Sequence, residues 1–206
     1  VEGTSGHMDT DDRVSTGIRV LDQMLDGGLP EQRTMLLTGG PGTGKSTIAM
    51  EFLQDGLESG DECLFVSTEQ TPDELRDGFS PFDFDLDHPD LNISTLHGAL
   101  RETREGQELV IRTLEGNQPI DDKNVPFTGQ NVQKYLQKKE AGDYDRVVLD
   151  SVSGLEPVHE NREAYRRSVL DLIRLFSDDF GATTIFTAEY SGDQHDEGAE
   201  TVGGPD

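Results

Sequence analysis

A segment of nine residues, GGPGTGKST at positions 39–47, constrains the fold of this chain more than any other feature of its sequence. It follows the spacing G-x-x-x-x-G-K-[ST] and lies between an apolar run at Thr34–Thr38 and a helical pattern at Ser46–Glu58. A glycine-rich loop in that position turns from a strand into a helix, and its backbone N–H groups surround phosphate oxygens. The segment therefore predicts a strand, a phosphate-binding loop and a helix in that order.

The loop also predicts which residues hold a nucleotide. Those expected to contact it are Gly40, Pro41, Gly42, Thr43, Gly44, Lys45, Ser46 and Thr47. The Lys45 ammonium can reach the β and γ phosphates, the Ser46 hydroxyl can ligate Mg²⁺, and Thr47 is expected near the α phosphate. We therefore expect ATP or ADP with Mg²⁺ at this loop. A glycine-rich turn without a ligand is the less favoured alternative, because both flanking patterns agree with the motif.

Strand and helix patterns alternate along the rest of the chain. Further strands are predicted at Glu62–Thr68, Leu91–Thr95, Arg146–Asp150 and Ala182–Ala188. Most of these are short apolar or β-branched runs, which suits strands buried on both faces of a parallel sheet. Further helices are predicted after the capping box Thr71-Pro72-Asp73-Glu74, over Gln130–Glu140, and along the stripe Tyr165, Val169, Leu172, Ile173 and Phe176. The alternation predicts an α/β fold with a mostly parallel central sheet flanked by helices.

A length of 206 residues is enough for one domain, which we place at residues 13–206. Residues 1–12 are polar, so we expect a disordered N-terminal segment, part of which, Ser5-Gly6-His7-Met8, is typical of an expression tag. The region Gly98–Gly129 is polar, is interrupted by Pro119 and Pro126, and has little periodicity. This region is therefore interpreted as an insertion or a mobile loop.

The composition is strongly acidic, with 42 Asp and Glu residues against 17 Lys and Arg residues. Acid spread along the whole chain indicates a halophilic protein, and in molar salt the Debye length of about 3 Å screens most of this charge. No apolar run approaches the roughly 18 residues of a membrane helix, so we expect no membrane partner. The single cysteine, Cys63, lies in an apolar run and predicts a buried structural thiol in a reducing, cytoplasmic setting.

Two acidic residues follow predicted strands and are candidates for the chemistry. Asp150 ends an apolar strand, and we expect it to hold Mg²⁺ through a coordinated water; a carboxylate that caps a turn is the alternative. Glu69 comes directly after Glu62–Thr68, at the strand end where ligands of open α/β sheets bind. It can accept a proton from an attacking water, and a solvated surface carboxylate is the alternative. Gln70 can orient the same water or face solvent.

Several motifs together resemble the KaiC-like branch of the RecA superfamily of P-loop ATPases. They are Ser15-Thr16-Gly17-Ile18, Leu21-Asp22, Gly27-Gly28-Leu29-Pro30, the phosphate loop, Phe65-Val66-Ser67-Thr68-Glu69 and Val148-Leu149-Asp150-Ser151. The resemblance covers roughly Val14 to Tyr190 and implies that Glu69 is the catalytic base. Members commonly carry two adjacent glutamates there, whereas this chain has Gln70 in second place, and Gln32 replaces a usual glycine. Glu189 matches a family position that senses the γ phosphate or touches a neighbouring subunit. Tyr190 stands where a basic residue is usual, and a surface carboxylate is the alternative for Glu189.

The resemblance also implies a homo-oligomeric ring, commonly of six subunits, with ATP between neighbours. Family members continue with strands that carry basic residues to the next nucleotide, and this sequence ends at Asp206 before such a segment. We therefore expect the domain to lack its C-terminal strands.

Three hypotheses about function follow. The leading one is a KaiC-like signalling ATPase that hydrolyses ATP slowly, with Mg²⁺, and couples hydrolysis to its oligomeric state or to a protein partner. The second is a nucleotide-binding interaction module with little hydrolysis. The third, a recombinase-like DNA-binding ATPase, is least favoured, since Asp193–Asp206 is acidic and contacts to nucleic acid phosphates need lysine or arginine.

Overall fold

The centre of the structure is a parallel sheet of five strands in the order β3-β12-β11-β4-β5. The computed structural model describes residues 12–103, 106–112, 114–115, 118–119, 125–126, 144–158 and 161–190. The strands are β3 (Thr34–Gly39), β4 (Cys63–Ser67), β5 (Leu91–Thr95), β11 (Arg146–Asp150) and β12 (Thr183–Glu189). All neighbouring pairs in this sheet are parallel. The predicted α/β class and all five predicted strands are therefore confirmed.

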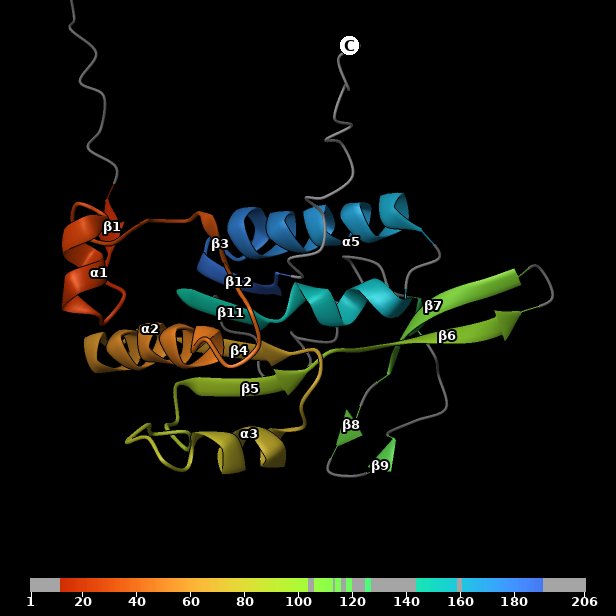
Figure 1. The fold of residues 1–206 in the computed structure, drawn as a ribbon, viewed down its shortest axis with the longest axis horizontal. Coiled ribbons are helices and arrows are strands. Elements are labelled where there is room, and N and C mark those ends of the chain that lie inside the picture. The colour runs from red at the N-terminus through yellow and green to blue at the C-terminus, as the bar shows by residue number, and fades with distance from the viewer. Residues whose placement is uncertain are drawn as a thin grey trace, which may run out of the picture.

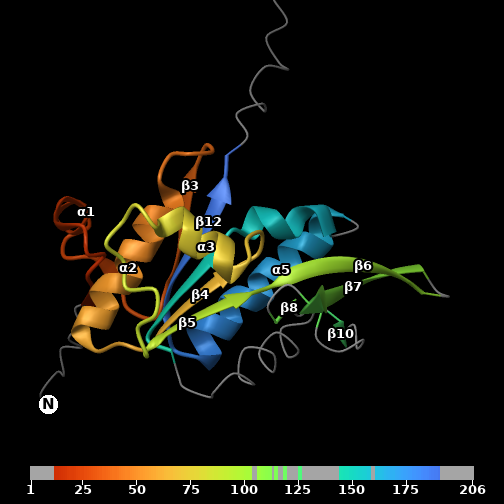
Figure 2. The same ribbon diagram turned by 90° about the horizontal axis from the view of Figure 1, so that it is seen from below.

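Helices cover both faces of this sheet. Helix α2 (Lys45–Ser59) and helix α3 (Pro72–Phe79) lie on one face, and α5 (Arg162–Arg174) lies on the other (Figures 1 and 2). A π-helical turn, Leu175–Asp179, continues α5, and a 3-10 segment, Val152–Val158, follows β11.

Successive residues of the inner strands enter two separate hydrophobic cores. In β4, Leu64 and Val66 pack towards α5, while Cys63 and Phe65 pack towards α2 and α3. The whole of β4 is buried, as the continuous apolar pattern predicts for a strand covered on both sides.

The ends of the helices follow the sequence signals. Gly44, with φ of 88°, precedes α2, and Gly60, with φ of 86°, ends it in the left-handed region that favours glycine. The capping box at α3 is present as predicted: the Thr71 side chain accepts from the Glu74 backbone N–H, and the Glu74 carboxylate accepts from the Thr71 N–H.

The region Gly98–Gly129 differs from its prediction. Strands β6 (His97–Thr103) and β7 (Gly106–Arg112) form an antiparallel hairpin, and β10 (Val125–Pro126) pairs with β7. A second small pair joins β8 (Leu114–Glu115) to β9 (Gln118–Pro119). The expectation of a loop is wrong for the hairpin, which extends away from the central sheet (Figures 1 and 2). The helix predicted at Gln130–Glu140 and residues 1–11 lie outside the described residues.

The segment before β3 is held together by partly buried polar contacts. It contains the short strands β1 (Arg13–Val14) and β2 (Leu29–Pro30), which pair antiparallel, and helix α1 (Arg19–Met24). The Asp22 carboxylate accepts hydrogen bonds from the Thr16 hydroxyl at 2.7 Å, the Thr16 N–H at 2.8 Å and the Ser15 hydroxyl at 3.0 Å. Partial burial alone raises the pKa of Asp22, but these hydrogen bonds outweigh it and leave the pKa below its ordinary value.

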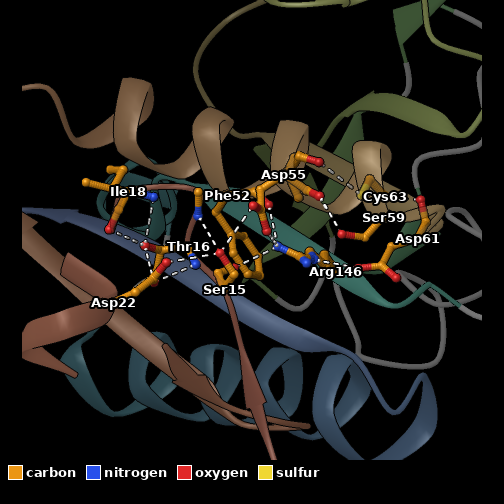
Figure 3. Close-up of polar contacts among 12 residues, drawn as sticks. Ser15, Thr16, Ile18, Asp22, Phe52, Asp55, Ser59, Asp61, Cys63 and Arg146 are labelled. Carbon is orange, nitrogen blue, oxygen red and sulfur yellow. Dashed lines mark hydrogen bonds and ion pairs between the residues drawn. The ribbon is translucent and has the colours of Figure 1, made fainter. Parts of the chain in front are cut away.

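Arg146 links this segment to the sheet (Figure 3). It is the first residue of β11, and its side chain is only 5% exposed. Its Nε donates to Asp61 at 2.7 Å, and its Nη1 lies 3.0 Å from Asp55. Nη1 also donates to the carbonyls of Ser15 at 2.8 Å and Phe52 at 2.9 Å. One guanidinium therefore holds β11, α2 and the N-terminal segment together.

Cys63 is fully buried, which confirms the predicted structural thiol. Burial, more than the nearby charges, raises the pKa of its thiol to about 12, so the group stays protonated in the folded protein.

We predict that Arg146→Ala lowers the free energy of unfolding by about 3 kcal/mol, because it leaves two carboxylates and two carbonyls without their shared donor. Urea unfolding in concentrated potassium chloride measures this. The matched control is Arg167→Ala, which removes the same charge from a pair whose side chains are 72% and 85% exposed, and we expect a change within about 0.5 kcal/mol. Equal effects of the two substitutions would contradict the assigned role of Arg146.

Candidate functional site

The carboxyl ends of the parallel strands place the candidate residues at one edge of the sheet. A cavity of about 380 Å³ opens there. Its lining residues are Pro41, Gly42, Thr43, Gly44, Lys45, Ser46, Thr47, Ser67, Glu69, Gln70, Asp150, Ser151 and Glu189. Parallel strands collect their carboxyl ends at the same edge, so residues far apart in the sequence share this cavity.

The glycine-rich loop between β3 and α2 forms one wall. The Thr43 hydroxyl donates to the Gly40 carbonyl at 2.9 Å and closes the loop on itself. A Cβ at Gly39 would lie 2.6 Å from the Thr43 hydroxyl oxygen, so a side chain at position 39 would displace this hydroxyl. Of the loop residues predicted to contact a nucleotide, all but Gly40 line the cavity, and the Gly40 carbonyl serves as an acceptor within the loop.

Lys45 is held by the loop that it follows. Its Nζ donates to the carbonyls of Gly39 at 3.0 Å and Gly40 at 2.9 Å. Among the described residues that line the cavity, it is the single cationic side chain, whereas Glu69, Asp150 and Glu189 are acidic. A triphosphate would therefore meet net negative charge unless a cation came with it.

The available ligand atoms suit Mg²⁺. The Ser46 hydroxyl and the Asp150 carboxylate line the same cavity and supply hard oxygen donors. The part of the chain that the structure describes holds no group of three or more His, Cys, Asp or Glu residues that could bind a metal by themselves. Mg²⁺ does not need such a group, since it commonly takes one or two protein oxygens and completes its shell with water and substrate phosphates.

The orientation of Asp150 is set by the neighbouring strand. Its Oδ1 accepts a hydrogen bond from the hydroxyl of Thr187 in β12, and Thr187 is fully buried. The Asp150 carbonyl accepts from the Thr68 N–H at 2.9 Å, which ties the ends of β11 and β4 together.

Glu69 lies beside the residue that follows Asp150. Its Oε1 accepts a hydrogen bond from the Ser151 hydroxyl at 3.2 Å. The adjacent Gln70 is exposed, and its backbone N–H donates to the Ser67 hydroxyl at 2.9 Å. Glu69, Gln70 and Asp150 all line the same cavity.

The sequence analysis assigned no role to three further hydroxyl residues, Ser67, Ser151 and Thr187. Ser67 is the last residue of β4, Ser151 directly follows β11, and Thr187 lies near the end of β12. Each hydroxyl accepts from or donates to a neighbouring strand or turn. The signal in the sequence was weak, because a hydroxyl at the end of a strand is common. Only the folded structure shows that Ser151 meets Glu69 and that Thr187 meets Asp150.

Glu189 reaches the cavity from the end of β12. It pairs in register with Gly39, and its backbone N–H donates to the Ser153 hydroxyl at 2.9 Å. Glu189 therefore lines the cavity beside the strand that leads into the loop.

A loop of this spacing at the carboxyl edge of a parallel α/β sheet defines a P-loop nucleotide-binding protein of the RecA-like class. The sequence matches the KaiC ATPase family over residues 14–203, and the chain belongs to that family. This membership supports ATP binding in general.

Individual relatives agree with this assignment. A UPF0273 protein of Saccharolobus solfataricus is 31% identical over 184 residues, which cover 87% of this chain and 61% of the relative. A UPF0273 protein of Thermotoga maritima is 28% identical, with 87% of this chain and 70% of the relative covered. The crystal structure of a KaiC-like protein from Pyrococcus horikoshii superposes with a TM-score of 0.64 at 29% identity, over 88% of this chain and 72% of that one. Within the described residues, no helix is both long and apolar enough to cross a membrane.

We predict that Lys45→Ala weakens ATP binding about 10- to 100-fold, because the charge-assisted hydrogen bonds of one ammonium are lost. Titration with a fluorescent ATP analogue in concentrated potassium chloride measures the dissociation constant. Arg76→Ala is the control, since it removes a cation that pairs with Asp73 and Asp87 outside the cavity. Unchanged affinity in Lys45→Ala would contradict the role of this lysine.

Proposed function

We propose that this chain binds ATP with Mg²⁺ and hydrolyses it slowly, and that hydrolysis is coupled to contacts with other copies or with a protein partner. The observation that supports this most directly is the meeting of Lys45, Ser46, Asp150 and Glu69 at one cavity. They provide a phosphate ligand, two metal ligands and a base, which are the parts that phosphoryl transfer to water needs.

In this proposal the loop and Lys45 bind the β and γ phosphates. The backbone N–H groups at the start of α2 favour negative charge, and the Lys45 ammonium exchanges its two carbonyl acceptors for phosphate oxygens. Ser46 and Asp150 hold the metal, which when bound offsets the charge of the phosphates. The Thr187 hydroxyl keeps the Asp150 carboxylate directed at the cavity.

Glu69 acts as the general base. It is exposed at the cavity wall, so a water molecule can reach it, and its carboxylate can take the proton as the water attacks the γ phosphorus. The hydrogen bond from Ser151 leaves further lone pairs of the carboxylate for this water.

The charge balance of the site supports slow turnover and dependence on assembly. Lys45 is the one cationic side chain among the described lining residues, so these residues offer little stabilisation of the charge that develops on the transferred group. A cation supplied by a neighbouring copy would accelerate the reaction, as cationic residues provided in trans do in other phosphoryl-transfer proteins. Hydrolysis would then depend on the subunit contact.

A nucleotide-binding module with little hydrolysis is the second candidate. Gln70 favours it, because an amide next to Glu69 cannot take up a proton as a second carboxylate would. A measured turnover rate separates the two functions.

We predict that Glu69→Gln lowers kcat at least about 100-fold, in the range expected for loss of a general base, and leaves ATP bound. Phosphate release in concentrated potassium chloride measures turnover, and filter binding measures retained ATP. Glu163→Gln is the control, since that carboxylate is 85% exposed on α5. The base assignment fails if Glu69→Gln turns over ATP at the wild-type rate, and the ATPase function fails if the wild type itself does not.

We predict that Thr187→Val raises the Mg²⁺ concentration needed for half-maximal ATP turnover by about tenfold, as expected when a metal ligand loses its orienting partner. A Mg²⁺ titration of phosphate release gives the shift. The matched control is Thr184→Val, another fully buried threonine of β12, whose hydroxyl donates to the Ala182 carbonyl. The same Mg²⁺ dependence in both variants would remove the orienting role of Thr187.

A further inference from the structure

The side chain of Glu69 is exposed, but a hydrogen bond from Ser151 restrains its rotation. A glutamate in water samples many rotamers, and fixing one of them costs side-chain entropy. Here the Ser151 hydroxyl donates to Oε1 at 3.2 Å, while Oε2 makes no hydrogen bond to any residue that the structure describes. One oxygen is therefore anchored, and the other is available to a water molecule.

The Ser151 backbone is held by Thr68, the residue that directly follows β4. The Thr68 hydroxyl donates to the Ser151 carbonyl at 2.6 Å and accepts from the Ser151 N–H at 3.1 Å. Both residues are buried, with exposures of 5% and 6%. Thr68 directly precedes Glu69. Its bonds to Ser151 therefore also fix the position of Ser151 relative to the Glu69 backbone.

Gly154 leaves the space in which this arrangement fits. A Cβ at position 154 would lie 2.4 Å from the Thr68 hydroxyl oxygen, 2.8 Å from Glu69 Cγ and 3.0 Å from Glu69 Oε1. A side chain at position 154 would therefore collide with the Thr68 hydroxyl and with the Glu69 carboxylate. The Gly154 N–H also donates to the Ser151 carbonyl at 3.2 Å, which turns the chain back over Glu69.

We propose that Ser151 is a positioning residue for Glu69, and that Gly154 provides the space this positioning needs. The inference rests on the proposed function, in which Glu69 is the base. A base must lie within hydrogen-bond reach of the proton it takes, and small displacements lower the rate steeply. In this proposal the Ser151 hydroxyl holds the Glu69 carboxylate in the orientation that faces the cavity. Ser151 does not take part in binding the phosphates.

The decisive test compares Ser151→Ala and Ser151→Thr in the wild type and in a Glu69→Ala background, by steady-state phosphate release in concentrated potassium chloride. We expect Ser151→Ala to lower kcat about tenfold with KM unchanged, since only the placement of the base is lost. Ser151→Thr keeps the hydroxyl and restores most of the rate. In the Glu69→Ala background, Ser151→Ala has less than about a twofold effect, because no carboxylate is left to position.

A crystal structure of the nucleotide-free Ser151→Ala variant gives a readout that does not depend on turnover. We expect the Glu69 side chain to lose its single orientation there, while the Thr68 bonds to the Ser151 backbone persist. Gly154→Ala is expected to displace Glu69 and to lower kcat as well. Gly78→Ala is its control, since a Cβ at Gly78 of α3 meets nothing within 4 Å.

Three results would overturn the proposal: wild-type or faster turnover in Ser151→Ala, an equal loss of rate in both backgrounds, or an unmoved Glu69 in the variant structure. The first would show that the hydroxyl is dispensable or restrains the base, and the second that Ser151 only supports the fold. Failure of the proposed function is separate, since it appears as absent turnover in the wild type or as normal turnover in Glu69→Ala.

Discussion

Burial of β4 and β11 on both faces fixes the register on which the whole site depends. Alternate residues of each strand enter opposite cores, so a slip of one residue would exchange the two sets of side chains. In the observed register Leu149 pairs with Val66, and Asp150 pairs with Ser67. The residues that directly follow these strands are Ser151 and Thr68, and the Thr68 hydroxyl forms two hydrogen bonds with the Ser151 backbone. Hydrophobic packing thus determines which polar groups meet at the edge of the sheet.

The electrostatics of the cavity follow from this packing. Parallel strands bring Glu69, Asp150 and Glu189 to one place, and Lys45 is the single cation among the described residues around them. Such a cavity is expected to bind a polyanion only together with a divalent metal. A cation supplied by another chain would further stabilise the negative charge. The same imbalance accounts for the hydroxyl partners of the carboxylates, because Thr187 and Ser151 can stabilise negative charge without adding any.

Local patterns in the sequence predicted the parts of the fold that local physics determines. The apolar runs gave the five central strands, and the loop spacing and the capping box gave the starts of two helices. The hairpin β6–β7 was missed because its strands are largely polar and lack a sustained alternation. The contacts of Ser151 with Glu69 and of Arg146 with Asp61 could not be predicted, since each joins residues more than 80 positions apart and depends on strand register.

Strand β11 is fastened at both ends, by Arg146 where it begins and by the bonds of Asp150 and Ser151 where it ends. The carboxylate proposed for the metal and the one proposed as the base are therefore oriented before any ligand arrives. Lys45 differs, because its ammonium is engaged by the carbonyls of Gly39 and Gly40 and must exchange them for phosphate oxygens. Nucleotide binding thus requires rearrangement mainly in the loop, and this rearrangement lowers the affinity for the nucleotide. The carboxylates proposed for the chemical step need little rearrangement.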